Sequence, residues 1–147
     1  MNPDENKIRQ RLLKHKLRPT RARIQILLIL GEKASHMTTE DIIKELKGRE
    51  IKIGAATVYQ NLVRLVEVRL LDRFLDSDGL LRYDINLNPH HHMICVRCGK
   101  VVDLGIKEHI LAGLPNDSLE IESPFKGWAV ESIQMEFRGV CPDCHKK

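Results

Sequence analysis

The four cysteines of this chain of 147 residues fall in two identical pairs, and this spacing restricts the fold more than any other feature: Cys95-x-x-Cys98 and Cys141-x-x-Cys144. Each pair can supply two thiolates from one tight turn, and four thiolates suit a tetrahedral zinc ion. The 42 residues between the pairs exceed the roughly 15 to 20 of a compact zinc ribbon. We therefore predict a structural Zn²⁺ that fastens the end of the chain to its middle. Disulfides and an iron–sulfur cluster are the alternatives.

The composition is that of a globular domain or two small ones, with 42% hydrophobic and 30% charged residues. No segment is apolar over a bilayer's width, and the polar residues 1–7 lack the apolar core of a signal peptide. We therefore expect a soluble cytoplasmic protein, which argues against disulfides and against a membrane partner.

Positive charge is concentrated near the start of the chain. Residues 1–86 carry 17 basic and 12 acidic side chains, and eight basic residues lie between positions 7 and 23 with no acid among them. Such a run is typical of a surface that binds a polyanion, although a solvated helix face is an equally ordinary interpretation.

The first 86 residues predict helices followed by a β-hairpin. Periodicity indicates a short exposed helix around residues 8–13, a second helix after Thr20, a third opened by a capping box from Thr38 to Asp41, and a fourth from near Gly54. Residues 69–75 and 80–85 are predicted strands around the turn 76–79. Three helices and a hairpin favour a winged-helix DNA-binding domain over residues 1–86, with a second domain over residues 87–147.

The fourth predicted helix has one apolar stripe, and its other face is rich in hydrogen-bonding side chains. We expect Tyr59, Gln60 and Asn61 to contact base edges or thymine methyls, and Thr57 and Arg64 to contact phosphates. Arg18, in the basic run, is expected to reach the minor groove or the DNA backbone.

Three consecutive histidines, residues 90–92, stand just before the first cysteine pair. In an extended strand His90 and His92 project from one face and His91 from the other. A chain that folds back at residues 97–98 places His92 opposite Asp103, with Cβ atoms some 5 Å apart. Two imidazoles and a carboxylate suit Fe²⁺, Mn²⁺ or Zn²⁺.

The chain resembles the ferric uptake regulator family of metal-responsive repressors. The resemblance lies in residues 17–23, 56–59, 90–100 and 139–144, in the family's order. It implies an α+β fold with an N-terminal winged helix and a C-terminal α/β dimerisation domain that carries the four-cysteine zinc site. It also implies a homodimer that binds a palindromic double-stranded DNA operator, with no enzymatic activity and no small organic substrate.

The resemblance further implies a regulatory ion held by His36, Asp84, His90, His92 and Asp103. Asp103, where iron-sensing members more often carry Glu, and Asp84 are most similar to the peroxide-sensing branch. In that branch bound Fe²⁺ reacts with hydrogen peroxide and a ligand histidine, here His36 or His90, is oxidised. An iron-responsive or a zinc-responsive repressor is the alternative. Pro89, His91 and Ile133 depart from an additional metal site of many members, so that site is not expected here.

Two functions from other classes remain as remote alternatives. A zinc-dependent enzyme lacks support because the chain has neither a His-Glu-x-x-His helix nor a His-x-Glu partner for its cysteine pairs. A metal-storage protein would account for the histidines but not for the polar helix face. Residues 114–126 are predicted only as a loop, and residues 128–137 as a strand.

Overall fold

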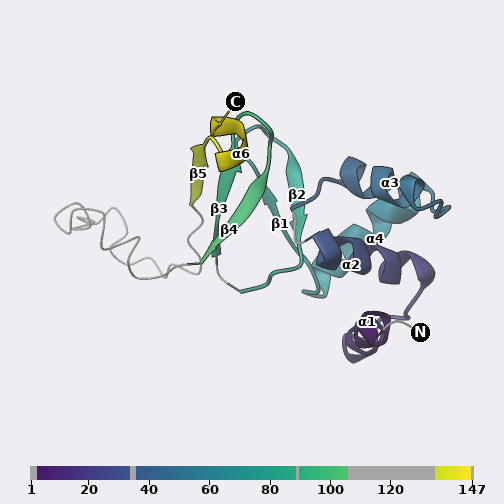
Figure 1. The fold of residues 1–147 in the computed structure, drawn as a ribbon. Helices are drawn as coiled ribbons and strands as arrows, with labels where there is room; N and C mark the ends of the chain where they lie inside the picture. Colours follow the sequence, from purple (N-terminus) through teal and green to yellow (C-terminus); the bar gives the residue numbers. More distant parts are fainter. Residues whose placement is uncertain (1–2, 34–35, 89, 106–134, 147) are drawn as a thin grey trace, which may run out of the picture. The chain divides into compact units, whose positions relative to one another are not determined.

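The computed structural model describes residues 3–33, 36–88, 90–105 and 135–146. The chain divides into two compact units, Met1–Leu87 and Asn88–Lys147. Helices dominate the first unit and a sheet the second (Figure 1). The predicted α+β class is therefore confirmed.

The first unit has the element order of a winged helix. Its elements are α1 (Pro3–Lys14), α2 (Arg21–Lys33), α3 (Thr39–Gly48), α4 (Ala55–Glu67), β1 (Asp72–Leu75) and β2 (Leu81–Asp84). The two strands pair antiparallel, with Arg73 opposite Tyr83. Thr38 opens α3 through the predicted capping box, because its Oγ1 accepts from the backbone N–H of Asp41 and its own N–H donates to that carboxylate.

The core of the first unit is aliphatic, with Tyr83 as its largest member. Helix α4 contributes its predicted stripe, since Val58, Leu62 and Leu65 are buried. The expectation for α1 was wrong. It extends over 12 residues, and Ile8 and Leu12 are buried because their i, i+4 spacing forms one apolar stripe.

The second unit is a three-stranded sheet with a short helix. Its described elements are β3 (His90–Cys95), β4 (Val101–Gly105), β5 (Glu136–Gly139) and α6 (Pro142–His145). The sheet order is β4-β3-β5, in which β4 pairs antiparallel and β5 parallel with β3. His92 pairs with Asp103, which is the predicted register.

Some predictions fall partly or wholly outside the described residues. Of the strand predicted over residues 128–137, positions 136 and 137 lie in β5, which continues to Gly139. Residues 128–134, which include Ile133, and the loop 114–126 are not described, and neither is Pro89. Within the described ranges, no helix is both long enough and apolar enough to cross a membrane.

Candidate metal centres and the exposed face of α4

The four cysteine sulfurs of the second unit converge. Each lies within 4.8 Å of the others, and Cys98 Sγ is 3.8 Å from Cys141 Sγ. A tetrahedral zinc ion with Zn–S bonds of about 2.3 Å separates its sulfurs by about 3.8 Å. All four cysteines are free of disulfides. The donor set and its spacing therefore fit the predicted structural zinc.

Backbone hydrogen bonds shape both cysteine turns. Gly99 has φ +72°, a value that favours glycine, and its N–H donates to the Cys95 carbonyl over 2.9 Å. Parallel pairing of β5 with β3 places Gly139 beside Cys95, and so delivers the second pair to the first. Arg97 donates from Nη1 to the Cys144 carbonyl over 2.8 Å and joins the two turns.

The thiols also influence one another electrostatically. The pKa of Cys95 is lowered to about 6, chiefly because the backbone N–H of Cys141, and then that of Cys98, donates to its sulfur. The pKa of Cys144 is raised to about 12, first by its hydrogen bond with the Cys141 thiol and then by that with Cys98. The two pKa values thus move in opposite directions, Cys95 toward the thiolate and Cys144 toward the thiol, and a bound dication would favour the thiolate form of both.

A second group of ligand atoms lies on one face of the same sheet. His90 Nε2 is 2.9 Å from His92 Nε2 and 3.6 Å from Asp103 Oδ1. His90 Nδ1 is 2.6 Å from the carbonyl oxygen of Asn88. Because a carbonyl only accepts, Nδ1 carries the hydrogen in this contact, which leaves Nε2 as the ring nitrogen that can bind a metal ion.

His91 lies on the opposite face of β3 and has a different role. It is buried, and its Nδ1 accepts a hydrogen bond from the Met135 N–H over 3.1 Å. That contact is structural and fastens residue 135 to β3.

In the first unit, His36 and Asp84 meet inside the domain. Both are buried, and His36 Nε2 lies 2.9 Å from Asp84 Oδ2. Asp84 Oδ1 accepts from the Asn86 N–H over 2.7 Å, and the His36 ring stands edge-on to Phe74 at 5.5 Å between centroids. A buried imidazole and a buried carboxylate in contact offer one nitrogen and one oxygen that could bind a metal ion. Neither residue has a local sequence pattern that would have selected it.

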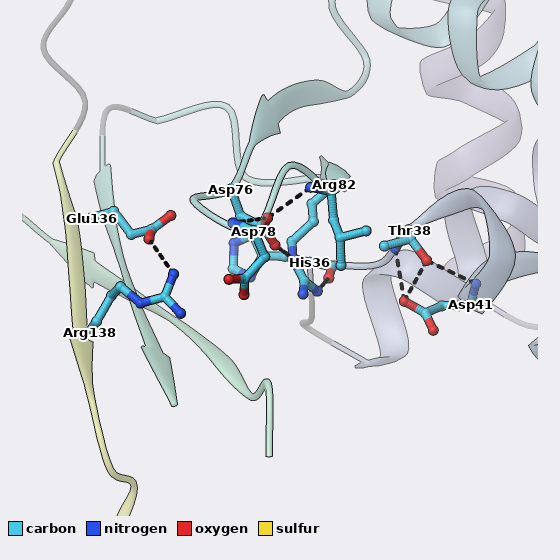
Figure 2. Close-up of polar contacts among 9 residues, drawn as sticks. His36, Thr38, Asp41, Asp76, Asp78, Arg82, Glu136 and Arg138 are labelled. Carbon is cyan, nitrogen blue, oxygen red and sulfur yellow. Dashed lines mark hydrogen bonds and ion pairs between the residues drawn. The ribbon is translucent and has the colours of Figure 1, made fainter. Parts of the chain in front are cut away.

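Strand β2 also holds the backbone beside His36. The Tyr83 N–H donates to the Met37 carbonyl over 2.9 Å, and Arg82 Nη1 donates to the His36 carbonyl over 3.0 Å. Figure 2 shows Arg82 between His36 and Asp76, the partner of its Nε at 2.6 Å. Burial would raise the pKa of Asp76, but the hydrogen bond from Arg82 and those from Leu80 and Asp78 outweigh it and leave the pKa below its usual value.

The side chains predicted to contact DNA do not share one environment. Tyr59 is 52% exposed, and Arg18, Thr57, Gln60 and Arg64 are exposed as well. Arg64 Nη1 pairs with Glu67 at 2.8 Å. Asn61 is half-buried, since its Oδ1 accepts from Arg23 Nε over 3.0 Å and its Nδ2 donates to the Thr57 carbonyl over 2.8 Å.

Sequence reasoning missed three arginines that hold these arrangements: Arg23, Arg82 and Arg97. Arg23 was noticed only as one charge of the basic run. Each donates to a backbone carbonyl distant in sequence or to a side chain on another element. Sequence spacing does not predict such long-range contacts.

A winged helix followed by a sheet unit with a four-thiolate cluster defines a class of metal-binding regulators. Residues 14–138 match the ferric uptake regulator family, and the chain belongs to this family of metal-responsive transcription regulators. Its members bind DNA as repressors and are not enzymes. Solved structures in the family carry iron, manganese or zinc.

Two relatives from Bacillus subtilis illustrate the similarity. The peroxide operon regulator is 34% identical over 131 residues, which cover 89% of this chain and 86% of the relative. The ferric uptake regulation protein is 31% identical over 137 residues, which cover 90% and 87%. The ferric uptake regulator of Vibrio cholerae has the same fold, with a TM-score of 0.71 at 22% identity, over 90% of this chain and 98% of that one.

Proposed function

We propose that the protein is a metal-dependent DNA-binding repressor that senses peroxide. The observation that carries the proposal is the 2.9 Å separation between Nε2 of His90 and Nε2 of His92, with His90 Nδ1 held against the Asn88 carbonyl. Ring nitrogens at this separation repel unless they share a proton or a cation. Two imidazoles beside the Asp103 carboxylate form a nitrogen and oxygen ligand set without sulfur, which suits Fe²⁺ or Mn²⁺, with Zn²⁺ as the alternative.

The remaining ligands would come from the first unit. We propose that His36 and Asp84 join His90, His92 and Asp103 in holding one regulatory ion, while the four cysteines hold Zn²⁺. Ligands from both units would fix the angle between them. In a homodimer that angle sets the spacing of two α4 helices, which must match major grooves of a palindromic duplex about 34 Å apart. Metal affinity and DNA affinity are then coupled reciprocally.

Asp rather than Glu at position 103, together with Asp84, supports peroxide sensing over iron sensing, since the resemblance places Glu more often at position 103 in iron-sensing members. The Bacillus relatives named for peroxide and for iron are about equally similar to this chain, so overall identity does not discriminate between them. Fe²⁺ held by these residues would supply the redox chemistry for cleavage of the O–O bond of hydrogen peroxide. One oxygen is transferred to the ring of His36 or His90, and the other leaves as water. The lost ligand lowers metal affinity and releases the DNA.

A gel-shift experiment tests the repressor function. Duplexes selected from a random-sequence pool with the Mn²⁺-loaded protein should be retained with Mn²⁺ or Fe²⁺ and released by a chelator that leaves the zinc in place. His36→Ala should lose the metal dependence and keep its zinc. Absence of any metal-dependent shift would remove the repressor interpretation and leave the enzyme or storage alternatives. A shift with Zn²⁺ alone would favour the zinc-responsive alternative.

Mass spectrometry tests the peroxide branch. After peroxide treatment of the Fe²⁺-loaded protein, peptides that contain His36 or His90 should gain the mass of one oxygen atom, and the Mn²⁺-loaded protein should stay unmodified. An iron-loaded protein that remains unmodified and on its DNA would assign it to the iron-responsive alternative.

A further inference from the structure

Arg82 links two parts of the first unit that are separate in the sequence. Its Nη1 donates to the His36 carbonyl over 3.0 Å, and its Nε donates to Asp76 Oδ2 over 2.6 Å (Figure 2). The Arg82 side chain is only 12% exposed and that of Asp76 is fully buried. A planar guanidinium can hold both acceptors at once in fixed directions, whereas a lysine ammonium is a single point of charge.

The Asp76 carboxylate that binds Arg82 is itself held by the hairpin turn. Asp76 Oδ1 accepts from the N–H groups of Asp78 over 3.0 Å and Leu80 over 2.9 Å. The hairpin turn therefore holds the carboxylate, and the carboxylate holds Arg82. Beside it, the Tyr83 N–H holds the Met37 carbonyl. Consecutive residues of β2 thus fix the backbone at positions 36 and 37 from an anchored turn.

The ring of His36 is held differently from its backbone. In the structure His36 Nε2 contacts Asp84 Oδ2, and the proposed regulatory site takes these two atoms as ligands. Atoms bound to an ion no longer hold each other by a hydrogen bond. The backbone contacts that Arg82 and Tyr83 make to residues 36 and 37 then remain, beside the packing of the ring against Phe74. Of the two backbone contacts, only the one from Arg82 depends on a side chain.

From these contacts we infer that Arg82, fixed by Asp76, is a positioning residue for the regulatory ligand His36 and thereby sets the affinity for the regulatory ion. The inference rests on the proposed metal-sensing function. Residues that orient a metal ligand typically contribute tenfold to a hundredfold to metal affinity. Arg82 is not among the proposed metal ligands or DNA contacts. Its effect is transmitted through the peptide of His36.

The test compares Arg82→Lys and Arg82→Met with wild type, all as full-length zinc-loaded protein. Mn²⁺ dissociation constants are obtained by competition with a fluorescent chelator, and zinc content and thermal midpoint are recorded for each variant. Lysine keeps the charge beside Asp76 but cannot also hold the His36 carbonyl. We expect Arg82→Lys to weaken Mn²⁺ binding about tenfold with full zinc content and a small change in thermal midpoint. Arg82→Met should weaken Mn²⁺ binding at least as much and also lower the midpoint.

Arg49→Met is the matched control. Arg49 also lies in the first unit and pairs with two carboxylates, Glu32 at 2.7 Å and Glu45 at 3.0 Å, but it does not contact residue 36. Its loss should lower the thermal midpoint and leave Mn²⁺ affinity unchanged. Equal loss of Mn²⁺ affinity in Arg49→Met and Arg82→Met would overturn the inference, because general destabilisation would then explain both.

The His36→Ala variant distinguishes failure of the positioning role of Arg82 from failure of the proposed regulatory site. If His36→Ala greatly weakens Mn²⁺ binding but Arg82→Lys binds as wild type does, the positioning role is wrong and the proposed function stands. If His36→Ala itself leaves Mn²⁺ affinity unchanged, the regulatory site is not built on His36, and the positioning role and the proposed ligand set are both overturned.

Discussion

Arg23 Nε donates to Asn61 Oδ1 over 3.0 Å and so connects the start of α2 to the exposed face of α4. Arg23 Nη1 also donates to the Arg18 carbonyl over 2.8 Å. With Nδ2 bonded to the Thr57 carbonyl, Asn61 retains one amide hydrogen for a base. Through Arg23, Asn61 also holds the segment that carries Arg18 against α4, the helix proposed to enter the major groove of DNA.

This arrangement predicts different outcomes for two neighbouring substitutions on α4. Gln60→Ala should relax sequence preference at one base pair, by about 1–3 kcal/mol, because an exposed amide can bond a base in two places. Asn61→Ala should weaken binding to all sequences, because it releases Arg23. Gel shifts against a selected duplex and its single-base variants measure both effects. A sequence-specific loss in Asn61→Ala would instead assign it to base readout.

Arg64 is predicted to contact a phosphate. Arg64→Ala should weaken binding about equally on every duplex and reduce the slope of log affinity against log salt by about 1. Lys100→Ala removes one positive charge from the second unit and serves as the control, with its salt slope unchanged. An Arg64→Ala protein whose salt slope equals that of wild type would exclude the phosphate contact.

Acid should weaken the first unit partly through Asp76. Its pKa in the folded protein lies below the usual value, so the ionised carboxylate stabilises the fold above about pH 4, and this contribution declines as the pH falls through the folded pKa. Asp76→Asn should therefore lower the free energy of unfolding more at about pH 7 than at about pH 3. Urea unfolding of both proteins at the two pH values measures the difference, and Asp72→Asn, at an exposed position on β1, is the control. A pH-independent difference would contradict the prediction.

Removal of one zinc ligand should destabilise the second unit. Cys98→Ser replaces a thiolate with a weak ligand and leaves three sulfurs, so the zinc content should fall to near zero. The thermal transition of the second unit should shift to lower temperature or disappear, because binding of a structural ion contributes directly to folding. Val96→Ala, at a side chain that is 53% exposed, should retain its zinc. Elemental analysis and calorimetry test both variants.

Local rules of sequence predicted much of this fold because the interactions involved are themselves local. The capping box at Thr38 and the start of α4 after Gly54 follow from residues a turn apart. The pairing of His92 with Asp103 follows from one tight turn and the two-residue period of strands. The error in α1 has the opposite cause. A basic segment was expected to be solvated throughout, whereas two apolar side chains are enough to bury one face of a helix.

The parts that sequence could not supply depend on contacts across the fold. His36 and Asp84 are 48 positions apart and meet inside the first unit, and only the family resemblance had selected them. Arg82 and Asp76 are close in sequence, but their role depends on the His36 carbonyl, which no local pattern identifies. Long polar side chains that bond distant backbone atoms leave no periodic signal.

Because β2 holds the backbone of residues 36 and 37 through Arg82 and Tyr83, the position of His36 depends on the length of the β1–β2 loop. Arg82 and Asp84 act through side chains on the same side of the strand, and Tyr83 acts through its backbone between them. Insertion or deletion of one residue before β2 would reverse the side on which every side chain of the strand lies. The Arg82 bond to the His36 carbonyl, the Tyr83 bond to the Met37 carbonyl and the contact between His36 and Asp84 would be lost together. Apart from Asp76 and Gly79, residues of the hairpin turn should therefore tolerate substitution better than the turn tolerates a change of length.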